Sequence, residues 1–455
     1  MDSVFVSLLL LGSIATSGNQ PFWGGANRYA LMPQGNGALG VINAGKEFNS
    51  AKIWQWHAGT SLACNYDSFD SEFHPMVDEL YAGVRWKVLT LDVGMKHNDA
   101  DFRAGDMKSS ISTTGGSVVW TGNCRTMPGY TITLSPWEVW KKHLWIEGAF
   151  GDYKTLDDRY VSDALVHNTR IGLTFGITGR FRFGIHFNHY AMWTGTHPEY
   201  GRMPATFENY IRMLFLRHAS SEGHAGDIVN VIGNHVGGEK FKFDYLGKGW
   251  KITFQHDIPY DDGSGMGFQN FPDGVNTLYF GFDDKNRWVS DILYEFTYTK
   301  WQSGPNHQEY DSKGELRIVG GNDDYFNNYY YRSGWTYYGR VIGLPLFIPM
   351  ERNDAGIVMG VKSNRIRAHH IGMAGKLFRK APYRLMLTCT SHFGTYDNPF
   401  ADAPLRQFSF GFEGDVPFSF GKRQALSIRY GLFGDCGDIC NNTLGATVGL
   451  CFKIY

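Results

Sequence analysis

The chain has 455 residues, a net charge of −1 at pH 7, 16% aromatic residues and 56 glycines. This charge balance gives no basic field of the kind that recognises nucleic acid. The mean hydropathy is −0.30, and no run approaches the ~20 apolar residues of a membrane helix, which excludes a helical membrane protein.

The N-terminal segment allows two interpretations. Residues 4–11 form an apolar run, and Ser13, Ile14 and Ala15 follow it. This resembles the hydrophobic region and cleavage site of a signal peptide, although residues 1–3 carry no positive charge. We expect residues 4–14 to form a first β-strand, and residues 1–14 as a signal-peptide remnant stay open as the alternative. In both cases we expect the protein to be exported.

Several later segments alternate apolar residues with polar or small ones. Only a strand, with side chains on opposite faces at period two, keeps such an apolar set on one side. A soluble β-sandwich also alternates. Here, however, arginines, acids and glycines recur opposite rows of Phe, Tyr and Ile, as a barrel with lipid outside and a polar lumen requires. The clearest segments are residues 171–177, 181–188, 292–299, 426–432 and 444–454.

The alternation predicts an all-β fold, a transmembrane antiparallel β-barrel of about 18 strands, with 16 also acceptable. Residues 1–455 form this single outer-membrane barrel domain, and both termini lie on the periplasmic side. The last strand should close the barrel on the first, because an unpaired edge is not tolerated in hydrocarbon. Predicted to face lipid are Phe181, Phe183, Ile185, Tyr294, Phe296, Ile428, Leu450 and Phe452, and predicted to face inward are Arg182, Glu295, Arg429 and Lys453.

Short helices are also predicted between the strands. Residues 204–217 begin with proline, and Phe207, Tyr210, Ile211 and Leu214 fall on one stripe. Residues 157–167 and 67–80 are weaker candidates. A barrel this wide must hold either water or a plug, and we expect the helices to occlude the lumen.

An aromatic and amide-rich segment at residues 327–340 is the candidate binding site. Sugar rings stack on aromatic faces, while Asn and Arg hydrogen-bond hydroxyls or acidic groups. The alternative is an aromatic girdle with ordinary loop polarity. The predicted glycan-binding residues are Asn328, Tyr330, Trp335, Tyr337 and Arg340.

The sequence shows no residue spacing that is typical of a catalytic or metal-binding site. His186 and His189 are three apart on a strand, so their rings should lie on opposite faces, as should those of His369 and His370. No nucleophile, base and acid can be assembled from spacing, and we expect no enzymatic activity, no cofactor and no metal. Six cysteines are scattered. Only Cys436 and Cys440 are close, and either a loop disulfide or free thiols fit there.

The segment NNYYYRSGWTYYGRVIGLPL, at residues 327–346, resembles a block of the capsule assembly Wzi family of outer-membrane proteins. Four further blocks follow the family order: QPFWGGANRYAL, TGNCRTMPG, GIHFNHYAMWTG and GDIVNVIGNHVG. The departures are Trp193-Thr194-Gly195, where Trp-Gly-Gly is expected, and Cys124, where alanine is expected.

The resemblance, which runs from about residue 20 to the C-terminus, implies an 18-stranded barrel with a helical plug. It also implies a lectin-like protein that holds capsular polysaccharide at the surface of a Gram-negative bacterium. The expected partners are capsular or related exopolysaccharide and the lipid bilayer of the outer membrane, with no nucleic acid, and we expect a monomer. Two other classes remain. A porin for small solutes would need an open lumen lined by opposed charges, and an outer-membrane hydrolase would need a Ser/His/Asx cluster at one interface.

Overall fold

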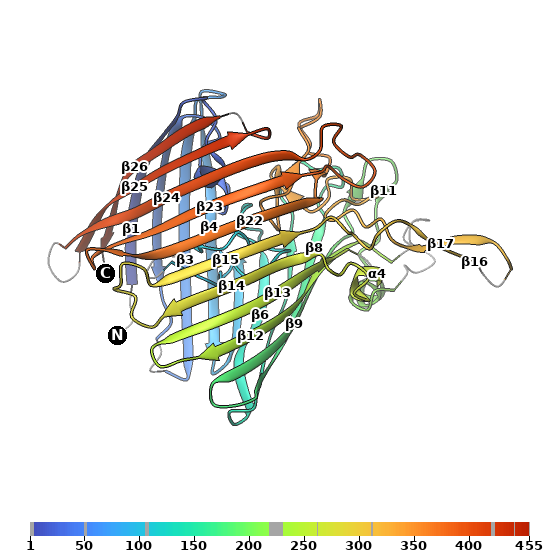
Figure 1. The fold of residues 1–455 in the computed structure, drawn as a ribbon, viewed down its shortest axis with the longest axis horizontal. Coiled ribbons are helices and arrows are strands. Elements are labelled where there is room, and N and C mark those ends of the chain that lie inside the picture. Colours follow the sequence, from blue (N-terminus) through green and yellow to red (C-terminus); the bar gives the residue numbers. More distant parts are fainter. Residues whose placement is uncertain are drawn as a thin grey trace.

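The computed structural model describes residues 4–49, 52–104, 109–217, 231–261, 263–310, 313–419, 424–440 and 442–454. Within them, one closed antiparallel sheet of 18 strands forms a barrel (Figure 1). The first and last strands pair from Val6 opposite Ile454 to Ala15 opposite Gly445. The predictions of an 18-stranded barrel, of a first strand over residues 4–14 and of its pairing with the last strand are therefore confirmed.

The barrel strands follow each other around the wall in chain order. They are β1 (Val4–Ala15), β2 (Gly37–Lys46), β3 (Trp54–Asp67), β4 (Glu72–Trp86), β5 (Leu89–Met95), β6 (Gly129–Trp140), β7 (Leu144–Lys154), β8 (Leu165–Gly176), β9 (Phe181–Trp193), β12 (Asn234–Leu246), β13 (Trp250–Tyr260), β14 (Gly274–Phe282), β15 (Asp291–Tyr298), β22 (Ile366–Leu377), β23 (Ala381–His392), β24 (Leu405–Ser419), β25 (Gln424–Gly437) and β26 (Thr443–Ile454).

In the part of the chain that the structure describes, the connections between the barrel strands contain short paired strands and three short helices. The paired strands are β10 (Thr196–His197) with β11 (Gly201–Arg202), β16 (His307–Tyr310) with β17 (Leu316–Gly320), β18 (Thr336–Tyr337) with β19 (Arg340–Val341), and β20 (Ile348–Pro349) with β21 (Val361–Ser363). The helices are α1 (Phe22–Gly25), α2 (Phe207–Leu214) and α4 (Gly263–Met266). Among the described residues, no helix is long and apolar enough to cross a membrane.

The two ends of the barrel differ. Both termini lie at one end, where consecutive strands are joined by short turns (Figure 1). The long connections, at residues 96–128, 194–233 and 299–365, all leave from the opposite end, which we call the loop end. In outer-membrane barrels the short turns face the periplasm, so we expect the loop end to face the outside of the cell.

The two faces of the wall agree with the predicted alternation. Phe181, Ile185, Tyr294, Ile428 and Leu450 are 38–50% exposed. Glu295 is completely buried on the inner face. The register aligns Ile428 with Leu450 and Arg429 with Gly449, which separates the apolar and charged sets as predicted. The apolar face surrounds the barrel because lipid covers it, and the polar face meets the lumen.

The barrel-closing strand offers a test of this assignment. Leu10 is 52% exposed and lies opposite Leu450 and Gly40. Leu10→Arg should lower the free energy of unfolding by about 2–4 kcal/mol, the cost of a charge on the lipid face at mid-membrane. Ser7→Arg, three residues away on the luminal face, is the control and should cost much less. Urea unfolding in detergent micelles would measure both, and equal losses would contradict the assignment of faces.

Two of the three predicted helices are wrong. Residues 204–217 contain α2, whose Thr206 side chain accepts a hydrogen bond from the backbone amide of Asn209. Residues 67–80, however, form the hairpin between β3 and β4, and residues 157–167 form a loop and the start of β8. Of the short helices expected to plug the lumen, α1 lies inside the barrel, where Trp23 packs against Met386 and Phe433 of the wall. Helix α2 packs through Met213 against Ala191 and Trp193, whose positions in β9 point outward, so α2 lies outside the wall.

The structure shows on which face each histidine ring lies and whether the cysteines are paired. His186 lies within 3.1 Å of Glu147 on the inner face, whereas His189 bonds His235 on the outer face, so the two rings point apart as predicted. His369 contacts Tyr294 outside, and His370 contacts Thr388 inside. All six cysteines, including Cys436 and Cys440, are free thiols in this structure.

Candidate functional site

A hydrophobic core lies inside the barrel near the loop end. Inward-facing wall residues such as Tyr190 and Val236 pack against Val118 and Val119 of the connection 96–128 and against Trp335 of the connection 299–365. The core also contains Tyr325, Phe326, Tyr331, Tyr337, Ile342, Leu344 and Phe347. These two connections therefore form a plug, and it consists of irregular chain rather than helix. This packing places apolar side chains across the lumen near the loop end.

Charged groups on the inner wall fasten the connection 96–128. Glu295 accepts hydrogen bonds from the Ser112 hydroxyl at 2.5 Å and from the Thr113 amide at 2.8 Å. Asp257 accepts from the Val118 amide at 2.8 Å. Glu295 was predicted only to face inward. In the structure its carboxylate replaces water as the partner of buried plug groups, which a satisfied interior requires.

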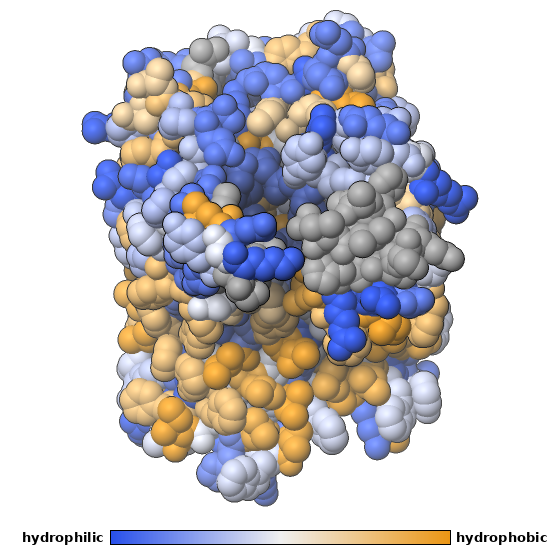
Figure 2. All heavy atoms as spheres, turned by 90° about the vertical axis from the view of Figure 1, so that its right-hand side faces the viewer, coloured by the Kyte–Doolittle hydropathy of each residue, from blue (hydrophilic) through white to orange (hydrophobic). Residues whose placement is uncertain are grey.

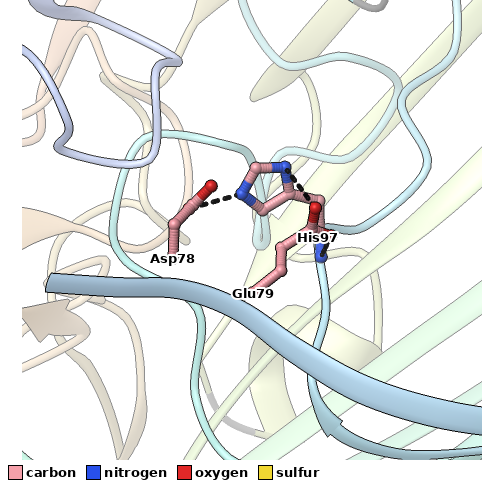
Figure 3. Close-up of side chains that lie close together, drawn as sticks. All are labelled: Asp78, Glu79 and His97. Atoms are coloured by element: carbon pink, nitrogen blue, oxygen red, sulfur yellow. Dashed lines mark hydrogen bonds and ion pairs between the residues drawn. The ribbon is translucent and has the colours of Figure 1, made fainter. Parts of the chain in front are cut away.

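A second attachment lies at the start of the same connection. The register slips between β3 and β4 at Ser61, so Asp78 is an extra residue and both Asp78 and Glu79 point into the lumen. His97 lies between the two carboxylates, 2.6 Å from Asp78 and 3.9 Å from Glu79 (Figure 3). Tyr29 stacks on the imidazole at 3.5 Å. Asp78, Glu79 and His97 lie close enough together to hold a metal ion. However, the two ring nitrogens face different carboxylates, so the arrangement fits a hydrogen-bonded attachment of the connection better.

Aromatic and charged side chains from three connections meet at the loop end, and we call this set the loop-face cluster. It consists of Tyr160, His197, Glu199, Tyr200, Tyr329, Tyr330 and Arg332. The imidazole of His197 lies 4.4 Å from Tyr200 and 4.6 Å from Tyr330, and the Tyr200 and Tyr330 rings are nearly parallel at 5.7 Å. Tyr200 is 49% and Tyr329 85% exposed.

Local backbone chemistry positions these rings. The Asn328 side-chain oxygen accepts hydrogen bonds from the amides of Tyr330 and Tyr331, both at 2.9 Å, which forms a tight turn. Ser333 accepts a hydrogen bond from the Tyr160 amide, so the connection 155–164 is held against the same turn.

The charges of the cluster are arranged around Tyr160. Its hydroxyl donates to Glu199 at 2.8 Å, and the Arg332 guanidinium lies over its ring at 5.0 Å. Arg332 also lies 5.6 Å from the Tyr329 ring and 3.9 Å from Glu199. Burial and the Glu199 carboxylate raise the pKa of Tyr160, so the hydroxyl keeps its proton. The cluster therefore offers ring faces, a cation and a carboxylate together at the surface.

The five predicted site residues are divided by the structure. Asn328 and Tyr330 lie in or beside the loop-face cluster. Trp335 and Tyr337 are completely buried in the plug core, so the prediction that they contact a glycan conflicts with the structure. Arg340 donates to the Gly25 carbonyl oxygen at 3.2 Å, so it contacts the connection between β1 and β2 and not the loop-face cluster.

The sequence interpretation missed most of the exposed cluster. Only Tyr330 of the cluster was among the predicted residues, although Tyr329 and Arg332 lie within the segment singled out. The residues missed are Tyr160, His197, Glu199, Tyr200, Tyr329 and Arg332. The signal was present as isolated aromatic residues in three separate loops, and only the fold brings these loops together. Figure 2 looks onto the loop end, where hydrophilic residues gather, while hydrophobic residues cover the part of the wall visible below it.

No protein-family model matches the chain, and no curated protein matches it in sequence. Among solved structures, a barrel described as Wzi, an outer-membrane carbohydrate-binding protein involved in group 1 capsule assembly in Escherichia coli, matches with a TM-score of 0.53. The match has 13% identity and covers 98% of this chain and 83% of that one. The fold is that of an outer-membrane β-barrel.

Other solved barrels match over comparable lengths. OpdO of Pseudomonas aeruginosa gives a TM-score of 0.49 at 10% identity, covering 99% of this chain and 97% of that one. OccAB2 of Acinetobacter baumannii gives 0.47 at 8% identity, covering 99% and 97%. At these identities the likeness concerns the fold alone, and the family resemblance noted in the sequence rests on its five blocks.

Proposed function

We propose that this protein is a non-enzymatic outer-membrane protein of a Gram-negative bacterium that holds capsular or related exopolysaccharide at the cell surface. The observation that supports this most is the loop-face cluster, in which exposed tyrosine rings stand beside an arginine and a carboxylate. Stacking on rings of this kind contributes on the order of 1 kcal/mol each. A long polymer reaches useful avidity by engaging many such weak sites at once.

The plug gives further support for a surface role over transport. A hydrophobic core joins residues 96–128, residues 299–365 and the inner wall inside the loop end of the barrel. A diffusion channel for small solutes is the alternative function, and it would require this core to be displaced. The Wzi barrel, the carbohydrate-binding neighbour in fold, and the five sequence blocks point in the same direction as the cluster.

The proposal is tested by removing the two exposed rings. Tyr200→Ala combined with Tyr329→Ala should weaken polysaccharide binding about tenfold or more, because two stacking contacts are lost. Flow cytometry of a deletion strain that carries the variant should then show less surface polysaccharide and more in the medium. Tyr310→Ala removes an equally exposed tyrosine outside the cluster and should have no effect.

The double variant tests the location of the binding site, and the deletion strain tests the proposed function. Unchanged retention in the double variant would place the binding site elsewhere on the protein. Full retention of polysaccharide in the deletion strain itself would remove the proposed function. Heat-modifiable gel mobility of each variant shows that the barrel has folded.

A further inference from the structure

A groove of ≈ 620 Å³ lies on the outer face of the wall, beneath the connection between β13 and β14. Phe241, Phe254, His256, Asn276 and Phe296 line it from the wall, and Phe271 of the connection covers it from above. The register sets Phe241 opposite His256, His256 opposite Asn276 and Asn276 opposite Phe296, so these side chains form one row on one face.

This row faces lipid rather than the lumen. Phe241 lies opposite Ile185, and the next residues of the same face, Leu278 and Tyr294, are exposed like the rest of the apolar surface. His256 is six residues beyond Trp250 at the short-turn end. At ~3.3 Å per residue and a tilt of ~40°, this is about 15 Å into a hydrophobic band of ~25 Å. The groove therefore lies in the outer half of the membrane.

The floor of the groove is polar where the surrounding row is apolar. His256 and Asn276 are adjacent in the middle of the row. The Asn276 side chain interacts with the His256 imidazole. It can satisfy only one of the two ring nitrogens, which are both shielded from the surface, so the other is left without a hydrogen-bond partner among the described residues. A polar group left unsatisfied in hydrocarbon costs several kcal/mol. A donor or acceptor carried by whatever lies in the groove would meet this requirement.

We propose that the groove binds an acyl chain of an outer-leaflet glycolipid. The chain lies along Phe241, Phe254 and Phe296 beneath the Phe271 ring, which is 6.0 Å from the His256 imidazole. A hydroxyl or carbonyl group on that chain bonds His256 and Asn276. Lipid is the only medium in contact with this face of the wall, and the outer half of an outer membrane is its glycolipid leaflet. The inference rests on the membrane position of the wall and not on polysaccharide binding.

The test uses the full chain in mild detergent, with native mass spectrometry and lipid A as the probe. Asn276→Phe fills the groove and removes the polar floor, while an aromatic residue remains acceptable against lipid. We expect it to weaken lipid A binding about tenfold, the effect of one hydrogen bond with its packing in hydrocarbon. Leu278→Phe, two residues away on the same face and outside the groove, should bind lipid A like the wild type.

A second variant guards against misfolding. Phe271→Ser lies in the connection, removes the cover and leaves the strands intact, and it should also weaken lipid A binding. Wild-type affinity in both groove variants would overturn the proposal. The proposal would also be overturned if phosphatidylethanolamine bound as tightly as lipid A and lost as much affinity in Asn276→Phe. The groove would then have no preference for glycolipid.

Discussion

Glu413→Ala is expected to lower the free energy of unfolding by about 3–5 kcal/mol, the cost of removing one partner from a buried ion pair. Glu413 of β24 lies between two arginines. The Arg384 Nε donates to it at 2.5 Å, and Arg28 pairs with it from the connection 16–36. The Arg384 side chain is only 2% exposed. Without the carboxylate, two guanidinium groups would stay in a poorly hydrated site.

The same pair fastens the plug to the wall. Arg384 also donates to the Ser110 carbonyl oxygen of the connection 96–128. The Arg28 bond to the Trp23 carbonyl oxygen, at 3.1 Å, stays within the connection 16–36. Loss of Glu413 should therefore loosen the plug as well as the wall. Urea unfolding in detergent micelles measures the first effect, and limited proteolysis within residues 96–128 measures the second.

Asp415→Ala provides the matched control for Glu413→Ala. Asp415 lies two residues away on the same inner face and pairs with Arg429 at 2.9 Å, but the Arg429 side chain is 36% exposed. A solvated pair contributes about 1 kcal/mol or less. If both substitutions cost the same, burial of the Glu413 triad would not be the source of its effect.

The wall of the barrel could be predicted from the sequence because its physical cause is local. Lipid on one side and a polar lumen on the other impose period two on each strand by itself. His186 and His189 illustrate this, since their spacing alone placed the rings on opposite faces. The pairing of β1 with β26 followed from the cost of an open edge in hydrocarbon.

The false helix at residues 67–80 has an identifiable cause. Val77 and Leu80 both face lipid, although they are three residues apart. The bulge at Asp78 adds one residue to β4, and the resulting spacing imitates the i, i+3 stripe of a helix. A bulge depends on the partner strand, so period analysis of a single segment could not detect it.

The plug and the site could be predicted only in part. Trp335 and Tyr337 have the composition of a sugar-binding surface and also of an aromatic core. Whether these rings form a binding surface or a core depends on the contact between residues 96–128 and residues 299–365, which are far apart in the chain. Asn328 and Tyr330 belong to the same predicted segment, and in the structure they lie in or beside the exposed loop-face cluster. Composition shows that aromatic residues are available, whereas burial depends on contacts between distant segments.

Trp335→Ala should have an effect as large as Glu413→Ala, but on the plug. Trp335 is completely buried, and its Nε1 donates to the Val119 carbonyl oxygen at 2.7 Å. Its ring lies 5.8 Å from Tyr190 of the wall and 6.1 Å from Trp120. Truncation of a buried tryptophan to alanine costs about 3–5 kcal/mol, because apolar burial is lost and a cavity remains. The Val119 carbonyl would also lose its partner.

The expected consequence is an opened lumen. Trp335 links the connection 299–365 to the connection 96–128 and to the wall, so its loss should separate the two halves of the plug. In planar bilayers we expect Trp335→Ala to conduct more than the wild-type barrel. Trp335→Phe keeps most of the ring volume but not the donor, and it should give an intermediate conductance. Tyr329→Ala, at an exposed ring of the loop-face cluster, should leave conductance unchanged while it weakens polysaccharide retention.

This set of variants also distinguishes the proposed function from the channel alternative. If the wild-type protein already conducts as strongly as Trp335→Ala, the plug does not seal the lumen and transport of small solutes becomes the better account. If Trp335→Ala conducts while its surface polysaccharide is unchanged, sealing and binding are separate properties of one barrel. The second result is the one that the structure favours, because the exposed rings of Tyr200 and Tyr329 lie outside the core to which Trp335 belongs.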